Sequence, residues 1–479
     1  MFLVRPYLKL TDNPWISPLI ELLDTSPYVS DNIHNEYSRT RGDSMGQVAF
    51  LLNMSILGIK NIEKEIKIDF YGKQVNKSFD SEQNKIKVIY GENGAGKTAI
   101  VTAVDIVKEF VLDDNYLRNP KNQLLLAELI NKQSKRFVFK CEFATFVDSL
   151  YIFEYQVCLS FDENGEVCVD FESLKYKKNN SRNVQTTAFV CEKGVLTELN
   201  VDKSERDGFI EKTKNLLSKQ SAIFSIFRSI AQNQNAFKER MLFVYPVVFF
   251  LLLSTYFDRE DRHITYYQKL RINELRRSQL PGDTVIEEIV QSIPANERKI
   301  PIKEYEKYKS KILGLERFIK LFKPTLSKID IDKKVDGEFY ICRIIMNYGN
   351  YTVDREFESA GIKHLIDMYD ALRSASNGSI VFIDEMDANI NDVMLRKLIE
   401  YFKFYGEGQL CITSHNTEPM LVLKDNNKAI DFLTSDNRLV PWIKNGHYSP
   451  ESCYRNGMID GLPFNIDSSD FIAVFGEVK

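Results

Sequence analysis

The pattern of apolar and polar positions divides the first half of the chain into distinct stretches. Residues 55–70 alternate as one or two strands would, and KIKVIY at 85–90 is a short apolar run that predicts a buried strand. The following stretch, 98–112, places apolar residues at helical spacing. Between 136 and 201, short apolar runs separated by polar turns predict a β-rich region.

In the second half of the chain, the spacing of apolar residues is first helical and then indicates strands that alternate with helices. From about 205 to 322 the spacing is helical, with six more basic than acidic residues. This bias suits a surface that faces a polyanion or a partner, and it suits a plain solvated helical face equally well. Further elements follow in this order: strands at 327–356, a helix at about 360–374, a strand at 379–384, a helix at 391–405 and a strand within 408–415.

One apolar run, MLFVYPVVFFLLLSTYF at 241–257, has almost the length of a membrane span. It contains Pro246 and is closed by the charged residues DREDR. Because a bilayer requires about 20 apolar residues, we predict a buried core helix here and no membrane association.

Composition and charge are those of an ordinary globular protein. The 479 residues suffice for two to four domain-sized units, and the net charge of −4 argues against a general nucleic-acid-coating role. The seven cysteines are scattered without C-x-x-C spacing and only five histidines are present, which argues against a zinc cluster. The N-terminal MFLVRPYLKL does not follow the pattern of a signal peptide. We therefore expect a cytoplasmic protein with reduced thiols.

The sequence GENGAGKT at 91–98 matches the phosphate-binding pattern G-x-x-x-x-G-K-[ST] between a predicted strand and a predicted helix. Its glycines allow backbone N–H groups to surround phosphates, and the helix N-terminus adds positive charge. Lys97 is expected to bridge the β- and γ-phosphates of ATP, and the Thr98 hydroxyl to hold Mg²⁺. The predicted nucleotide-binding residues are Gly91, Asn93, Gly94, Ala95, Gly96, Lys97 and Thr98.

A second motif, SIVFIDE at 379–385, is a run of apolar strand residues that ends in two acids. This is the form of a Walker B motif, in which the carboxylate at the strand end reaches the Mg²⁺ shell. We predict that Asp384 is this metal-side carboxylate and that Glu385 is the general base for the attacking water.

Together with the strand that ends in Ser414 and His415, these motifs resemble the ABC-type ATPases of the SMC, RecF and OLD proteins. The resemblance implies that His415 is the switch histidine that contacts the γ-phosphate and acts in catalysis. It also implies a signature loop, for which ESAGIK at 358–363 retains the serine (Ser359) and the second glycine (Gly361) of LSGGQ.

In such enzymes the signature acts in trans, so the resemblance implies ATP held between two copies in a dimer or a higher homo-oligomer. Residues 386–392 (MDANIND) would then cross the dimer interface. Gln123 and Gln156 are the two candidates for the Q-loop glutamine, and the sequence does not decide between them.

A narrower resemblance extends over roughly residues 51–437. GENGAGKT, an E-S-L element at 172–174, ESAG, FIDE and TSHN occur in the order seen in the AAA_15, or OLD-like, ATPases of bacterial anti-phage systems such as PARIS and AbiL. It implies an α/β fold in which an ABC-ATPase P-loop core carries a β-rich lobe and a helical insertion between Walker A and the signature.

The expected organisation has five parts. They are an N-terminal arm, partly flexible (1–50), a first ATPase lobe with Walker A and the β-rich subdomain (51–204), the helical insertion (205–322), a second lobe with signature, Walker B and His415 (323–437), and a C-terminal extension (438–479).

About sixty residues follow His415, and they lack the acidic pattern of a TOPRIM nuclease. We therefore predict an ATPase that senses infection through a phage-encoded trigger and controls a separate toxin or nuclease effector. A TOPRIM-like nuclease is one candidate for that effector. A DNA-repair ATPase that binds DNA directly, as RecF and SMC proteins do, remains the main alternative. A transporter subunit is disfavoured by the roughly 260 residues between Walker A and the signature.

Overall fold

The computed structural model describes residues 49–461, with gaps at 72–74, 76–78, 80–83, 147–148, 180–183, 215, 232–236, 258–296, 427 and 445–447. Nearly all of the predicted N-terminal arm therefore lies outside the described residues. The same is true of residues 258–296 of the predicted helical insertion and of the last 18 residues of the C-terminal extension.

A six-stranded, mainly parallel sheet forms the centre of the molecule. Its strands, in spatial order, are β17 (Leu439–Pro441), β16 (Ile430–Leu433), β3 (Ile86–Gly91), β15 (Gln409–Thr413), β14 (Ile380–Ile383) and β9 (Leu253–Tyr256). Both faces are buried. In β14, Val381 and Ile383 face one core, whereas Ile380 and Phe382 face the other. This two-sided burial explains why these strands are continuous apolar runs in the sequence.

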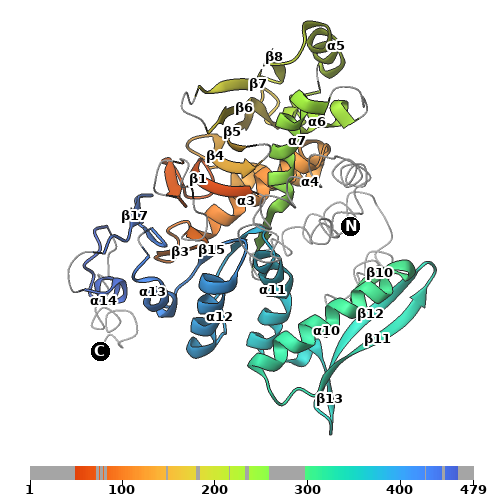
Figure 1. Ribbon diagram of the computed structural model, residues 1–479, viewed down its shortest axis with the longest axis vertical. Coiled ribbons are helices and arrows are strands. Elements are labelled where there is room, and N and C mark those ends of the chain that lie inside the picture. Colours follow the sequence, from red (N-terminus) through yellow and green to blue (C-terminus); the bar gives the residue numbers. More distant parts are fainter. Residues whose placement is uncertain are drawn as a thin grey trace, which may run out of the picture.

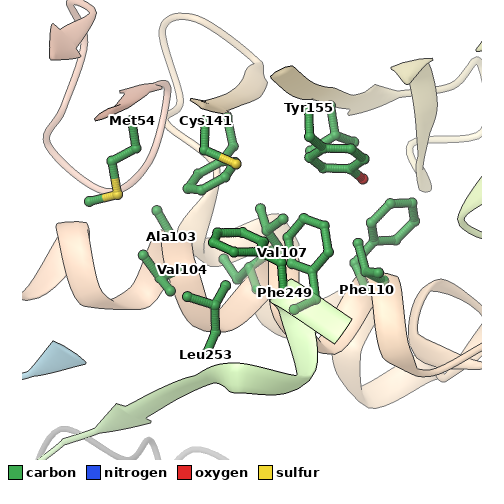
Figure 2. Close-up of a cluster of buried hydrophobic side chains, with 14 of the residues drawn as sticks. Met54, Ala103, Val104, Val107, Phe110, Cys141, Tyr155, Phe249 and Leu253 are labelled. Carbon is green, nitrogen blue, oxygen red and sulfur yellow. The ribbon is translucent and has the colours of Figure 1, made fainter. Parts of the chain in front are cut away.

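A seven-stranded antiparallel sheet packs against one face of the central layer. Its strands, in spatial order, are β2 (Ile66–Asp69), β1 (Ala49–Leu57), β4 (Arg136–Phe146), β5 (Leu150–Phe161), β6 (Val167–Lys178), β7 (Thr186–Glu192) and β8 (Val195–Leu199). Helix α3 (Lys97–Leu112) and helix α7 (Phe237–Leu252) lie beneath it. Figure 2 shows Cys141 and Tyr155 of this sheet pointing toward Val107 of α3 and Phe249 of α7.

A second core lies on the other face of the central sheet. It is formed with α10 (Tyr305–Phe322), α11 (Ala360–Ser376), α12 (Asp392–Tyr405) and α13 (Glu418–Leu423). A small sheet packs on α10 and contains β10 (Glu297–Pro301), β12 (Phe339–Asn347) and β11 (Lys328–Asp336), with β13 (Thr352–Asp354) paired to β12. Figure 1 shows α11 and α12 on the opposite side of the central sheet from α3.

Further described helices and turns complete the fold. They are η3 (Tyr116–Arg118), α4 (Pro120–Leu129), α5 (Lys203–Thr213), α6 (Ala222–Ala231), η5 (Ile302–Glu304), η6 (Arg355–Phe357) and α14 (Pro450–Arg455).

The segment 205–322 differs from the helical insertion that the sequence predicts. It contains helices, but it also contributes β10 and, more importantly, β9, which pairs in parallel with the Walker B strand β14. Most of the apolar run after residue 242 is buried, as predicted, yet the run is helical only up to Leu252. The last residues of this run form an edge strand of the central sheet, so this part of the segment is integral to the core.

None of the helices in the described part of the chain has the length and apolar character needed to cross a bilayer.

Candidate nucleotide site

The loop 91–96 joins the end of β3 to the first residue of α3. Gly94 and Gly96 have φ values of 81° and 111°, in the left-handed region that favours glycine. Gly96 is also the residue that precedes the helix, so its conformation turns the chain directly into α3. Ala95 is buried, whereas Asn93 and Gly94 are exposed. The loop thus presents an open backbone surface in front of a helix N-terminus, which is the arrangement that favours anion binding.

Lys97, the first residue of α3, is buried beneath this loop. Its Nζ donates to the carbonyl oxygens of Gly91 at 2.8 Å and Glu92 at 3.0 Å. Burial lowers the pKa of Lys97, and the nearby carboxylates of Glu385 and Asp384 oppose this effect. The ammonium group therefore lies within the electrostatic field of the two acids predicted to act with it.

Asp384 and Glu385 follow the last residue of β14. The Thr413 hydroxyl, at the end of β15, donates to Asp384 Oδ1 at 2.5 Å and accepts from the backbone N of Glu385 at 2.8 Å. Glu385 has a φ of 48°, a left-handed conformation that is uncommon for a residue other than glycine. The strand ends are thus joined by a side chain that holds both acids in place.

The residues expected to hold Mg²⁺ fit that role. Asp384 is buried, and its Oδ2 has no hydrogen-bond partner within the described residues. Thr98 lies in the first turn of α3, beside the loop. Mg²⁺ prefers oxygen ligands and is commonly held by one or two protein groups together with substrate phosphates. An unsatisfied carboxylate oxygen near a phosphate-binding loop is consistent with this arrangement.

His415 lies two residues beyond the end of β15. Its backbone N donates to the carboxylate of Asp387 at 3.2 and 3.3 Å, and the backbone N of Asn416 donates to the same carboxylate at 3.0 Å. Burial lowers the pKa of the His415 imidazole, and the positive charge of Lys97 lowers it further. The histidine and the lysine therefore lie in one site, although 318 positions separate them in the sequence.

The central sheet brings these groups together. Strands β3, β15 and β14 are adjacent and parallel, so the loops at their carboxyl ends lie at one edge. In open parallel sheets this edge is where ligands bind. The P-loop, the Asp384–Glu385 pair and His415 all occupy it.

The predicted signature residues lie at the start of α11. Ser359 caps this helix by accepting from the backbone N of Ile362 at 3.4 Å. Gly361 packs so closely on the loop after Walker B that a Cβ would overlap the carbonyl oxygen of Asn389. Within the part of the chain that the structure describes, no hydrogen bond joins this turn to the P-loop. The structure thus places Ser359 and Gly361 at the N-terminus of helix α11.

The two Q-loop candidates differ in their surroundings. The side-chain amide of Gln123 donates to the carbonyls of Leu117 and Val167 at 2.5 and 2.9 Å and accepts from the Val167 N at 2.7 Å. This side chain therefore links α4 to β6 through hydrogen bonds. Gln156 lies within β5, in the antiparallel sheet.

Three residues at the site were not predicted from the sequence. Asn61, in the turn after β1, donates to the carbonyl of Gly94 in the P-loop. Thr413 joins the two acids, and Asp387 holds the backbone at His415. The TSHN motif contains Thr413, but the sequence does not indicate that its hydroxyl contacts Asp384 and Glu385, because these contacts depend on the pairing of β14 with β15.

Three comparisons with known proteins bear on these observations. The family described as AAA domain, putative AbiEii toxin, Type IV TA system matches residues 86–420, more than half of the chain. Among solved structures, the chain is similar to one titled "Crystal structure of the SmcHead bound to the C-winged helix domain of ScpA", at 14% sequence identity and a TM-score of 0.38. The similarity covers 84% of this chain and 99% of that one. A comparison with curated proteins gives no match.

Proposed function

We propose that this chain, which belongs to the family of AAA domains described as putative AbiEii toxin, Type IV TA system, binds and hydrolyses ATP with Mg²⁺. The observation that carries the proposal is the convergence of Lys97, the Asp384–Glu385 pair and His415 at one edge of three adjacent parallel strands. We also propose, from the motifs, that the chain is similar to the ATPases of the AAA_15 group, which include those of PARIS and AbiL.

Each group has a chemical role in the proposed reaction. Lys97 would place positive charge on the transferred phosphate, and Glu385 would accept the proton of the attacking water. Thr98 and Asp384 would hold Mg²⁺, which neutralises charge on the phosphate oxygens when it is bound. His415 would contact the γ-phosphate from the neighbouring strand end.

We further propose that two copies share each ATP. The signature turn at Ser359 has no hydrogen bond to the P-loop among the described residues, and a helix N-terminus suits a phosphate offered by another subunit. Phe357, two residues before Ser359, is 84% exposed. An aromatic side chain this exposed beside a polar helix start supports a contact with a second copy.

The proposed output is control of a separate effector. The family description names a toxin and a toxin–antitoxin system. A ligand shifts an equilibrium between two conformations only because it binds one of them more tightly. ATP would therefore act by favouring one conformation of a surface to which the partner binds. We propose that the partner is a toxin or nuclease and that a phage component triggers its release.

A plaque assay tests this role. This gene and its genomic neighbour are expressed singly and together in a host challenged with phage. Protection should require both genes, and both Lys97→Ala and Glu385→Gln should remove it. Full protection from this gene alone would contradict the proposal of a separate effector. ATP-dependent binding of DNA by the purified chain, without phage protection, would favour the DNA-repair alternative.

A further inference from the structure

His364, in the second turn of α11, lies at a buried junction and is only 4% exposed. Its Nε2 lies 3.4 Å from the carbonyl oxygen of Met386, and its Nδ1 lies 3.4 Å from the hydroxyl oxygen of Tyr256. A carbonyl oxygen only accepts hydrogen bonds, so Nε2 is the nitrogen that carries the proton toward Met386. In the neutral ring, Nδ1 then accepts from the Tyr256 hydroxyl. Both ring nitrogens are thus used in one orientation of the side chain.

The two partners of His364 lie on either side of the catalytic acids. Met386 directly follows Glu385 in the sequence. Tyr256 is the last residue of β9, and its backbone carbonyl accepts from the backbone N of Asp384 at 2.9 Å. The imidazole therefore contacts the chain just after Glu385 through Met386, and the strand beside Asp384 through Tyr256.

A second contact joins the same helix to the same loop. The first turn of α11 lies against residue 389 so closely that Gly361 leaves no room for a side chain next to the carbonyl of Asn389. Asn389 itself has a φ of 59°. Helix α11 thus contacts residues 386–389 twice, through the backbone of Gly361 in its first turn and through the side chain of His364 in its second turn. Packed interfaces of this kind tend to move as a unit.

We propose that His364 is a positioning residue that couples the signature turn of α11 to the backbone of Glu385. This inference rests on the proposed ATPase function. A phosphate that contacts Ser359 would shift the start of α11, and the hydrogen bond from His364 to the Met386 carbonyl would carry that shift to Glu385. The left-handed backbone of Glu385 makes the orientation of its carboxylate sensitive to such a shift.

The test separates turnover from binding and from stability. His364→Phe retains an aromatic ring and removes both hydrogen bonds, and His364→Gln restores an N–H group that can reach the Met386 carbonyl. We expect His364→Phe to lower kcat for ATP by about tenfold or more while the nucleotide Kd changes by less than about threefold. His364→Gln should recover part of kcat. Tyr256→Phe, which leaves the bond to Met386 intact, should have a smaller effect.

A control on the same helix identifies a merely structural effect. Asp370, six residues further along α11, forms an ion pair with Lys311 at 2.6 Å. Asp370→Asn should lower the melting temperature but not kcat. The proposal is overturned if His364→Phe retains wild-type kcat, or if both variants lose kcat in proportion to their loss of melting temperature.

A double-mutant cycle keeps the proposal testable if His364→Phe fails to fold. The cycle compares Ser359→Ala, His364→Gln and the double variant. If His364 acts through the signature turn, the fold-decrease in kcat of the double variant should be smaller than the product of the fold-decreases of the two single variants. A double variant whose fold-decrease in kcat equals that product would overturn the proposed coupling between Ser359 and His364. Failure of the proposed function itself is a distinct result, in which the wild-type chain does not hydrolyse ATP or Lys97→Ala does so at the wild-type rate.

Discussion

The Thr413 hydroxyl donates to Asp384 Oδ1 at 2.5 Å while it accepts from the backbone N of Glu385. One side chain from β15 therefore sets the positions of both acids at the end of β14. Because the two strands pair in parallel, this contact links the two acids to the segment that carries His415.

Thr413→Val tests the importance of this contact. Valine has nearly the same volume but cannot donate or accept, so Asp384 and Glu385 each lose a partner. We expect kcat for ATP to fall by about tenfold to a hundredfold, with a loss of about 1–3 kcal/mol in the free energy of unfolding. Thr213→Val is the control, because its hydroxyl binds only backbone carbonyls within α5. Equal kcat values for the two variants would show that Thr413 does not position the acids.

Glu385→Gln should separate ATP binding from hydrolysis. Glutamine retains the size of the side chain and most of its hydrogen bonding but cannot accept a proton from water. We expect nucleotide affinity close to that of the wild type, hydrolysis lower by about a hundredfold or more, and an ATP-dependent increase in mass to that of a dimer or larger oligomer. Light scattering with and without ATP measures the last effect. Glu400→Gln, on α12, serves as the control, and normal hydrolysis by Glu385→Gln would remove Glu385 from the catalytic role.

Glu172 should make stability depend on pH. Its carboxylate accepts from the backbone N of Ala222, the hydroxyls of Ser221 and Tyr155 and, at 3.3 Å, the backbone N of Ile223. Burial nevertheless raises the pKa of Glu172 from 4.5 to about 7. Between these values the folded chain retains a proton that the unfolded chain releases, so this group's contribution to stability falls as the pH rises.

The measurement is urea unfolding of the wild type and Glu172→Gln at pH 5 and pH 8. The neutral glutamine lacks this titration, so the stability of the wild type relative to the variant should fall by about 2.5 kcal/mol over this range. All other titrating groups are shared by the two proteins. A difference that is the same at both pH values would show that Glu172 has a similar pKa in the folded and unfolded chains.

Phe249→Ala tests whether α7 belongs to the core. Phe249 stacks on Phe143 of the antiparallel sheet, with ring centroids 3.9 Å apart, and both side chains are buried. Removing this ring should cost about 3–5 kcal/mol in the free energy of unfolding. Phe404→Ala on α12, where the side chain is 66% exposed, should change it by less than about 0.5 kcal/mol. Similar small effects for both would indicate that α7 is dispensable for the core.

The parts of the fold that were predicted from sequence are those with a strong local pattern. The strand before the P-loop, helix α3 and the strands of the β-rich region follow directly from apolar spacing. The end of the apolar run at 241–257 was assigned to a helix because periodicity cannot distinguish a short buried strand from a buried helix. Only its pairing with β14 shows that Leu253–Tyr256 is a strand.

The same distinction holds at the site. The P-loop and the Asp384–Glu385 pair are contiguous motifs, so the sequence alone identifies them. Thr413 and His364 contact residues that lie 22 to 108 positions away in the sequence. These contacts exist only after the strands have paired, and a single sequence carries no local signal for them.

The most direct test of the central claim is a phosphate-release assay on the purified chain with ATP and Mg²⁺. The wild type should hydrolyse ATP, and Lys97→Ala should abolish turnover because it removes the mobile positive charge beneath the P-loop. Lys108→Ala, on the same helix but paired with Glu109, should retain the wild-type rate. Turnover by Lys97→Ala within about twofold of the wild type would contradict the assignment of this edge of the sheet as an ATP-hydrolysing site.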